Sequence, residues 1–164
     1  MIDVVYTCPF VPAEWITAHG LRACRIVPRP NCRPSGVPTT GVCAYARSFA
    51  EHVLDLDSDT AVVFTSRCDQ MRRLYDLVAA QRNGPTFLLN VPATWRTPGG
   101  GCLPTAERLY AHELQRLSRF LQQAGGSAPD RERLAAEIVR TRSNPGTPNI
   151  SVRERTKQPD GEDA

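Results

Sequence analysis

The chain has 164 residues, which is enough for one domain with a substantial core, and 41% of these residues are hydrophobic. A formal net charge of only +3 argues against nucleic acid and against an anionic membrane surface as partners. No apolar run approaches the length of a membrane span and no signal pattern begins the chain, so we expect a cytoplasmic protein whose six cysteines do not form stable disulfides.

The first elements in chain order are a strand, a helix and a second strand. Residues 2–7 have the pattern of a strand, and Cys8 follows it directly. A proline at the first turn predicts a helix over residues 12–19, with Glu14 placed where the helix dipole favours a carboxylate. Residues 23–27 form the second expected strand.

A proline-rich loop over residues 28–42 comes next, and Cys43 ends it by opening a helix that runs to about residue 56. Residues 61–64 are a run of β-branched and aromatic residues typical of a buried strand. A polar turn then leads to Cys68 at the opening of the next helix. Cys43 and Cys68 therefore share one placement, at a junction between loop and helix. The partial positive charge of a helix N-terminus stabilises a thiolate, which is the form that binds metal.

The remaining elements are a strand over residues 86–91, a glycine- and proline-rich loop over 96–104, and helices over 105–123 and 130–140. Helical spacing predicts that apolar side chains of the two helices face inward: Leu109, Leu114, Leu117, Phe120 and Leu121, then Leu134 and Ile138. The apolar pattern stops at residue 141, so we expect one domain over residues 1–140 and a disordered tail over 141–164. The order of elements predicts an α/β fold, an open parallel sheet with helices on both faces.

Four ordered segments carry a resemblance to a known family. They are Tyr6-Thr-Cys8-Pro-Phe-Val-Pro12-Ala-Glu14, Cys43-Ala-Tyr-Ala-Arg47, Val63-Phe-Thr-Ser-Arg-Cys68-Asp69-Gln-Met-Arg72-Arg73-Leu-Tyr, and Asn90-Val-Pro92-Ala-Thr-Trp95 with the helix after it. Together they resemble the amino-terminal domain of the 2-hydroxyacyl-CoA dehydratase family, of the 2-hydroxyglutaryl-CoA dehydratase D-component type, which includes the benzoyl-CoA reductase subunits. The resemblance covers roughly residues 2–138.

The resemblance implies a flavodoxin-like domain, a [4Fe-4S] cluster and an acyl-CoA substrate. It further implies a second dehydratase subunit and an ATP-dependent iron–sulfur activator protein. In such enzymes the thioester is reduced to a ketyl radical before water is lost; related members reduce an aromatic ring. Carried over by position, Cys43 and Cys68 match the metal ligands, while Cys8, Glu14 and Arg72 are candidates for the substrate pocket.

Less specific interpretations remain open for each of these residues. For Cys43, Cys68 and Cys8 the alternative is a buried free thiol. For Glu14 it is an ordinary carboxylate in the first turn of a helix, and for Arg72 it is a place on a solvated helix face. The other cysteines and the histidines are expected to be structural or solvent-facing: Cys24 in the core, Cys32 and Cys102 in loops, and His19, His52 and His112 in helices.

Family members also carry a second α/β domain, which we do not find in this sequence, and a third cluster ligand is expected from that domain. The alternative function is therefore a truncated, non-catalytic α/β domain that keeps the fold and pairs with a full-length subunit. A thiol-redox or zinc protein has less support, because no CxxC pattern occurs.

Overall fold

A computed structural model describes residues 1–28, 37 and 40–143. The elements follow the expected order, and every boundary that was predicted lies within three residues of the observed one: β1 (Asp3–Tyr6), α1 (Ala13–Ala18), β2 (Arg22–Arg25), α2 (Ala44–Leu54), β3 (Ala61–Thr65), α3 (Asp69–Gln81), β4 (Thr86–Leu89), α4 (Pro104–Gln123) and α5 (Arg131–Ser143). Most of the predicted loop over residues 28–42, including Cys32, lies outside the described residues, as does the tail beyond residue 143.

Within the described residues, four strands form one parallel sheet in the order β2-β1-β3-β4. Val5 of β1 pairs with Cys24 of β2 on one side and with Val62 of β3 on the other. Strands of such sheets are covered on both faces, which explains why every residue of β3 is buried and why all of them except Thr65 are apolar. The predicted open parallel sheet is confirmed.

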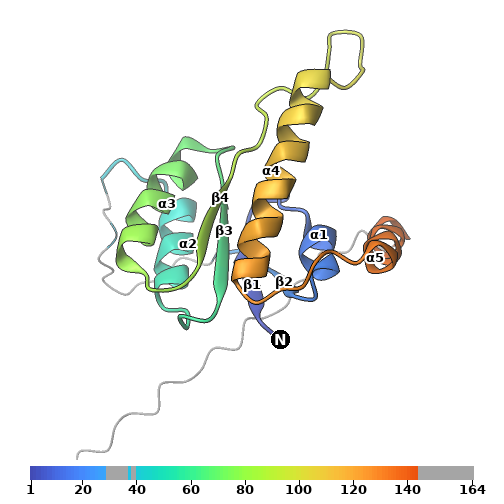
Figure 1. Ribbon diagram of the computed structural model, residues 1–164. Coiled ribbons are helices and arrows are strands. Elements are labelled where there is room, and N and C mark those ends of the chain that lie inside the picture. Colours follow the sequence, from blue (N-terminus) through green and yellow to red (C-terminus); the bar gives the residue numbers. More distant parts are fainter. Residues whose placement is uncertain (29–36, 38–39, 144–164) are drawn as a thin grey trace, which may run out of the picture.

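Successive strand residues point to opposite faces and so build two separate cores. Val4 and Tyr6 of β1 join a core with residues of α1 and α4, whereas Val5 joins a core with residues of α2 and α3. Figure 1 shows the resulting three layers, with α2 and α3 on one side of the sheet and α1 and α4 on the other. Cys24 is fully buried in the second core, as predicted, and burial raises its pKa to about 11, which keeps it a thiol.

Helix α4 is longer than the sheet that it covers. Its C-terminal half buries Leu117 and Leu121 in the first core, while its N-terminal half projects past the sheet together with the loop before it (Figure 1). Leu109 lies in this projecting half and is 43% exposed, so the prediction that it faces inward is wrong. The helical spacing was correct, but no layer of the sheet lies beneath that turn.

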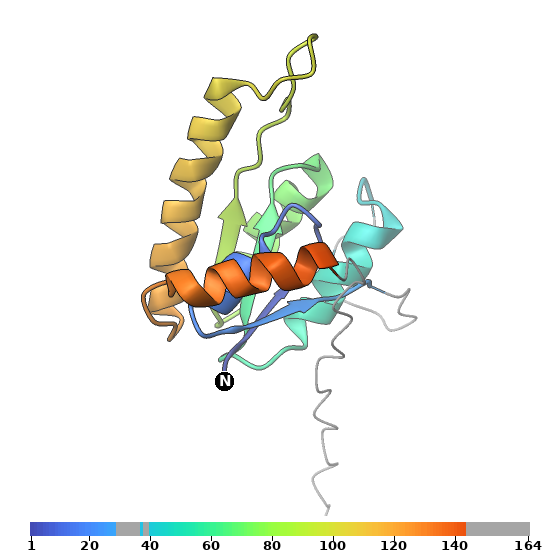
Figure 2. The same cartoon turned by 90° about the vertical axis from the view of Figure 1, so that its right-hand side faces the viewer.

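Helix α5 packs across α1 and outside the three layers (Figure 2). It buries no residue completely; Leu134 is half-buried, and Ile138 is 37% exposed against the inward position predicted for it. The helix also continues to Ser143, three residues into the segment predicted to be disordered. No helix of the described residues combines the length and the hydropathy needed to cross a membrane.

Buried His19 joins the end of α1 to α4 and to the segment before α5. Its Nδ1 lies 2.7 Å from the carbonyl oxygen of Ser127, and its Nε2 lies 3.0 Å from Oγ of Ser118. A carbonyl oxygen only accepts, so Nδ1 carries the proton and Nε2 accepts from the Ser118 hydroxyl. Trp15 Nε1 donates to the same Oγ over 2.9 Å, which completes a network that suits a neutral imidazole. The prediction of a structural role for His19 fits this arrangement.

We expect His19 to make the protein less stable in mild acid. Burial lowers its pKa from the ordinary value of 6.5, although the bond to Ser127 opposes this. The unfolded chain therefore takes up a proton before the folded chain does, so the stabilisation is complete above pH 6.5 and is lost as the pH falls toward the folded-state pKa. Urea unfolding of the parent and of His19→Gln over this range measures the effect.

His19→Gln should be less stable at neutral pH and should show a flatter decline as the pH falls below 6.5, since its amide does not titrate. Arg108→Gln, at an exposed residue of α4, is the matched control. Equal pH slopes for the parent and His19→Gln would contradict the prediction.

Candidate functional site

The carboxyl ends of the four strands form the edge of the sheet where open α/β proteins bind ligands. The chain leaves β1 toward β2 and leaves β3 toward β4, in opposite directions, although β1 and β3 are neighbours. This topological switch point is the usual position of the binding crevice. Cys8 lies just after β1, and Cys68 lies just after β3.

Cys68 is the N-cap residue of α3 and is exposed. Its extended backbone, with φ of −124°, turns the chain from β3 into the helix, and its carbonyl oxygen accepts the first helical bond from the Arg72 amide at 3.0 Å. The cap lacks a side-chain hydrogen bond, so the thiol is not used in capping. The prediction that the cysteine opens this helix is confirmed.

Cys43 has the same place at α2, where it is the N-cap residue and is exposed. Its sulfur accepts a hydrogen bond from the Ala46 amide over 3.4 Å. The hydroxyl of Tyr45, in the first turn of α2, is hydrogen-bonded to Oγ1 of Thr7, which directly follows β1. This contact fixes the start of α2 beside the carboxyl end of β1. Because α2 and α3 also pack against each other, both cysteines begin neighbouring helices of one layer.

Cys8 and Glu14 lie on the other face of the sheet. Cys8 is half-buried and packs against the core formed with α1 and α4, and Glu14 is in the first turn of α1. Burial raises the pKa of Tyr110 on α4 to about 12, and the nearby charges of Glu14 and Cys8 add to the rise. These three side chains therefore share one neighbourhood on the α1 and α4 face. Arg72 is exposed on α3, in the layer of Cys43 and Cys68.

The thiols of Cys43 and Cys68 suit iron by their softness and by the positive ends of the helices that they begin. Among residues 1–28, 37 and 40–143, however, no group of three or more His, Cys, Asp or Glu side chains is placed to hold a metal ion. The described residues thus fit a cluster only as part of its ligand set.

An aromatic cluster lies near this edge of the sheet, and its contacts were not predicted from the sequence. The rings of Phe10 and Trp95 stack with centroids 6.4 Å apart, and Tyr110 packs edge-on to Trp95 at 5.1 Å. Arg67, one residue before Cys68, places its guanidinium over Phe10 at 5.4 Å and donates to the carbonyl oxygen of Ala93 over 2.7 Å. The segments that follow β1, β3 and β4 are thereby held together.

The signal for this cluster was present in the sequence, because aromatic residues follow two strands at their carboxyl ends. Their mutual contact depends on strand order, since the chain separation of Phe10 and Trp95 is large. Tyr110 confirms the closeness of the segments by donating its hydroxyl proton to the carbonyl oxygen of Phe10 over 3.0 Å.

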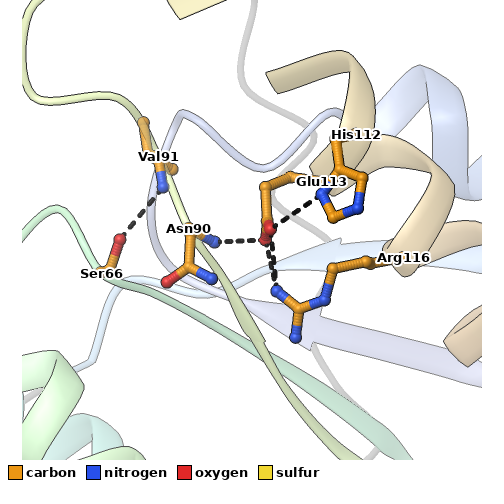
Figure 3. Close-up of polar contacts among 6 residues, drawn as sticks. All are labelled: Ser66, Asn90, Val91, His112, Glu113 and Arg116. Atoms are coloured by element: carbon orange, nitrogen blue, oxygen red, sulfur yellow. Dashed lines mark hydrogen bonds and ion pairs between the residues drawn. The ribbon is translucent and has the colours of Figure 1, made fainter. Parts of the chain in front are cut away.

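A buried carboxylate, Glu113 of α4, holds the end of β4 (Figure 3). It accepts a 2.9 Å hydrogen bond from the Asn90 amide and two from Arg116 Nη1, at 2.8 and 2.7 Å. Burial by itself raises the pKa of Glu113, but the hydrogen bonds from Arg116 and Asn90 outweigh it, so the pKa lies below its ordinary value. Glu113 is therefore ionised at neutral pH.

Comparison with known proteins identifies the family. The family model described as 2-hydroxyglutaryl-CoA dehydratase, D-component, matches residues 8–144, which is most of the chain and includes both N-cap cysteines. A search of curated proteins found no match. The family match agrees with the parallel sheet and with the resemblance found in the separate sequence segments. The chain belongs to the 2-hydroxyglutaryl-CoA dehydratase D-component family.

Proposed function

We propose that this chain is an iron–sulfur component of a 2-hydroxyacyl-CoA dehydratase-like enzyme. One observation carries the proposal: in a member of this family, two exposed cysteines begin adjacent helices at the ligand-binding edge of the sheet. A [4Fe-4S] cluster bound there would supply a low-potential electron and an open iron site. The ligands from this chain would be Cys43 and Cys68, and the rest of the set would come from outside the described residues.

The surroundings of the two cysteines support a site that binds an anionic substrate. Arg72 is exposed in the first turn of α3, the helix that Cys68 caps, and its guanidinium offers a planar set of donors suited to the phosphates of coenzyme A. The N-termini of α2 and α3 add their partial positive charge at the same edge. A negatively charged acyl-CoA is therefore favoured over a cationic ligand.

The remaining candidates are proposed to line the same site, and their contacts support this. Tyr45, held by Thr7, presents a phenol two residues from Cys43, where it can donate a hydrogen bond to a bound oxygen. Cys8 lies just after β1 at the same edge of the sheet, and Glu14 is in the first turn of α1, so we assign both to the wall of the substrate pocket on the α1 and α4 side. The activator protein and the second subunit are the partners that the family implies.

Reconstitution of the chain with iron and sulfide under anaerobic conditions tests the proposal. We expect a brown protein with acid-labile sulfide and up to about four irons per chain, since a cubane holds four. Repeating the reconstitution with zinc in place of iron is the control for adventitious thiol binding, and it should give no visible absorbance. A colourless protein without iron would contradict the proposal and would leave the non-catalytic alternative as the better account.

A further inference from the structure

We propose that Ser66 and Glu113 are positioning residues that clamp the exit of β4 and thereby fix the turn that carries Cys68. The inference goes beyond the ligand assignment, and it rests on the proposed function only in treating Cys68 as a ligand. Figure 3 shows the side chains of Ser66 and Glu113 with the amides of Val91 and Asn90 that they accept from.

The clamp begins where the backbone pairing of β3 and β4 ends. The Ser66 amide donates to the carbonyl oxygen of Leu89 over 3.0 Å. Beyond this point the chain after β3 turns away from β4. Val91 is the next residue after Leu89 whose amide points toward β3, and this amide has no backbone acceptor there. Oγ of Ser66 takes that place and accepts from the Val91 amide over 3.0 Å. One serine thus ties the turn to the neighbouring strand through both its backbone and its side chain.

Glu113 holds the opposite side of the same segment. Along a strand, successive amides point to alternate sides, and β4 is an edge strand, so the Asn90 amide points away from β3. Glu113 reaches from α4 and accepts this amide at 2.9 Å, while Arg116 holds the carboxylate in place. Glu113 is only 3% exposed, so water does not compete freely for the bond.

The clamp extends to the cysteine through Arg67. The carbonyl oxygen of Ala93, two residues after Val91, accepts a hydrogen bond from Arg67 Nη1 at 2.7 Å. Arg67 directly precedes Cys68 in the chain. Ser66 and Arg67, the two residues between β3 and Cys68, are therefore both anchored to the β4 end and the short segment after it. A metal ligand displaced by a fraction of an ångström binds less well, which gives such anchoring a functional purpose.

Three readouts on the protein without any cluster test the inference. Amide hydrogen exchange by NMR at Asn90 and Val91 reports the clamp, and exchange at Arg72, whose amide bonds to the Cys68 carbonyl, reports the cysteine turn. The alkylation rate of Cys68 by iodoacetamide, measured by peptide mass spectrometry relative to Cys102, reports the position of the thiol.

In Ser66→Ala we expect exchange at Val91 and at Arg72 to rise about fivefold and Cys68 alkylation to rise about threefold, as loss of one hydrogen bond favours local opening. Ser66→Thr keeps the hydroxyl and should stay close to the parent. Ser58→Ala, at an exposed serine, is the matched control.

Glu113→Gln keeps an acceptor oxygen for the Asn90 amide and should change these rates less than Glu113→Ala. If Glu113→Ala does not fold, Glu113→Gln decides the role of Glu113. Exchange at Asn90 equal to that of the parent, together with unchanged Cys68 alkylation, in every Glu113 variant that folds would overturn that role. Unchanged exchange at Arg72 and unchanged Cys68 alkylation in Ser66→Ala would overturn the inference, even with faster exchange at Val91. Failure of the parent to bind iron would instead count against the proposed function alone, since none of these rates depends on a cluster.

Discussion

Replacing Cys43 and Cys68 together by serine is expected to remove bound iron, from up to about four irons per chain in the reconstituted parent to almost none. Serine is a strong helix N-cap residue, so it keeps the capping bond that the Cys43 sulfur accepts from Ala46. Its hydroxyl is a hard and weakly acidic ligand that does not replace a thiolate on iron. The variant thus separates ligation from capping.

Iron and acid-labile sulfide per chain measure this effect, with unfolding in urea as the check on the fold. Because both cysteines are exposed, we expect the free energy of unfolding to stay within about 0.5 kcal/mol of the parent. Cys102→Ser is the matched control at another exposed cysteine and should keep its iron. Full iron content in the double variant would assign the cluster to other residues.

The largest expected effect on stability comes from Arg82, which is buried at the C-cap of α3 and 8% exposed. Its guanidinium donates to four backbone carbonyl groups at the base of the α2–β3 and α3–β4 connections: Val53 at 3.1 Å, Pro85 at 3.4 Å, and Asp57 and Thr60 at 2.6 Å each. Burial lowers the pKa of Arg82, and the charge of Asp59 only partly opposes this. One side chain thus satisfies the ends of several elements at once.

We expect Arg82→Met to lower the free energy of unfolding by about 3 kcal/mol, because buried carbonyl groups lose their charged donor. Arg82→Lys keeps the charge but not the planar array of donors, so it should restore only part of this loss. Urea unfolding followed by circular dichroism measures both. Arg73→Met, at an exposed arginine of the same helix, should lie within about 0.5 kcal/mol of the parent.

Gly84 offers an independent check of the same contact. A Cβ atom at this position would lie 2.2 Å from Arg82 Nη1, so Gly84→Ala has to displace the guanidinium. We therefore expect Gly84→Ala to be destabilising in the parent and nearly neutral in the Arg82→Met background. An additive loss in the double variant would contradict the role given to Arg82.

The order of the elements and the positions of both N-cap cysteines could be predicted from the sequence alone. Local patterns were sufficient for this, because a buried strand such as β3 is a continuous apolar run and a helix start is marked by the end of that run and a polar turn. Cys43 and Cys68 were therefore located correctly at their helices before any contact was known.

Which segments meet at the carboxyl edge of the sheet is visible only in the folded chain. Strand order brings Phe10 to Trp95, and Glu113 to Asn90, across long stretches of chain, and no local pattern encodes such pairs. Leu109 shows the same limit from the other direction, since helical spacing gives the face of a helix but not how far the sheet beneath it extends. The burial of Arg82 could not be predicted either, because its neighbours in the sequence are those of an ordinary exposed helix end. The fold places four backbone carbonyl groups around its guanidinium.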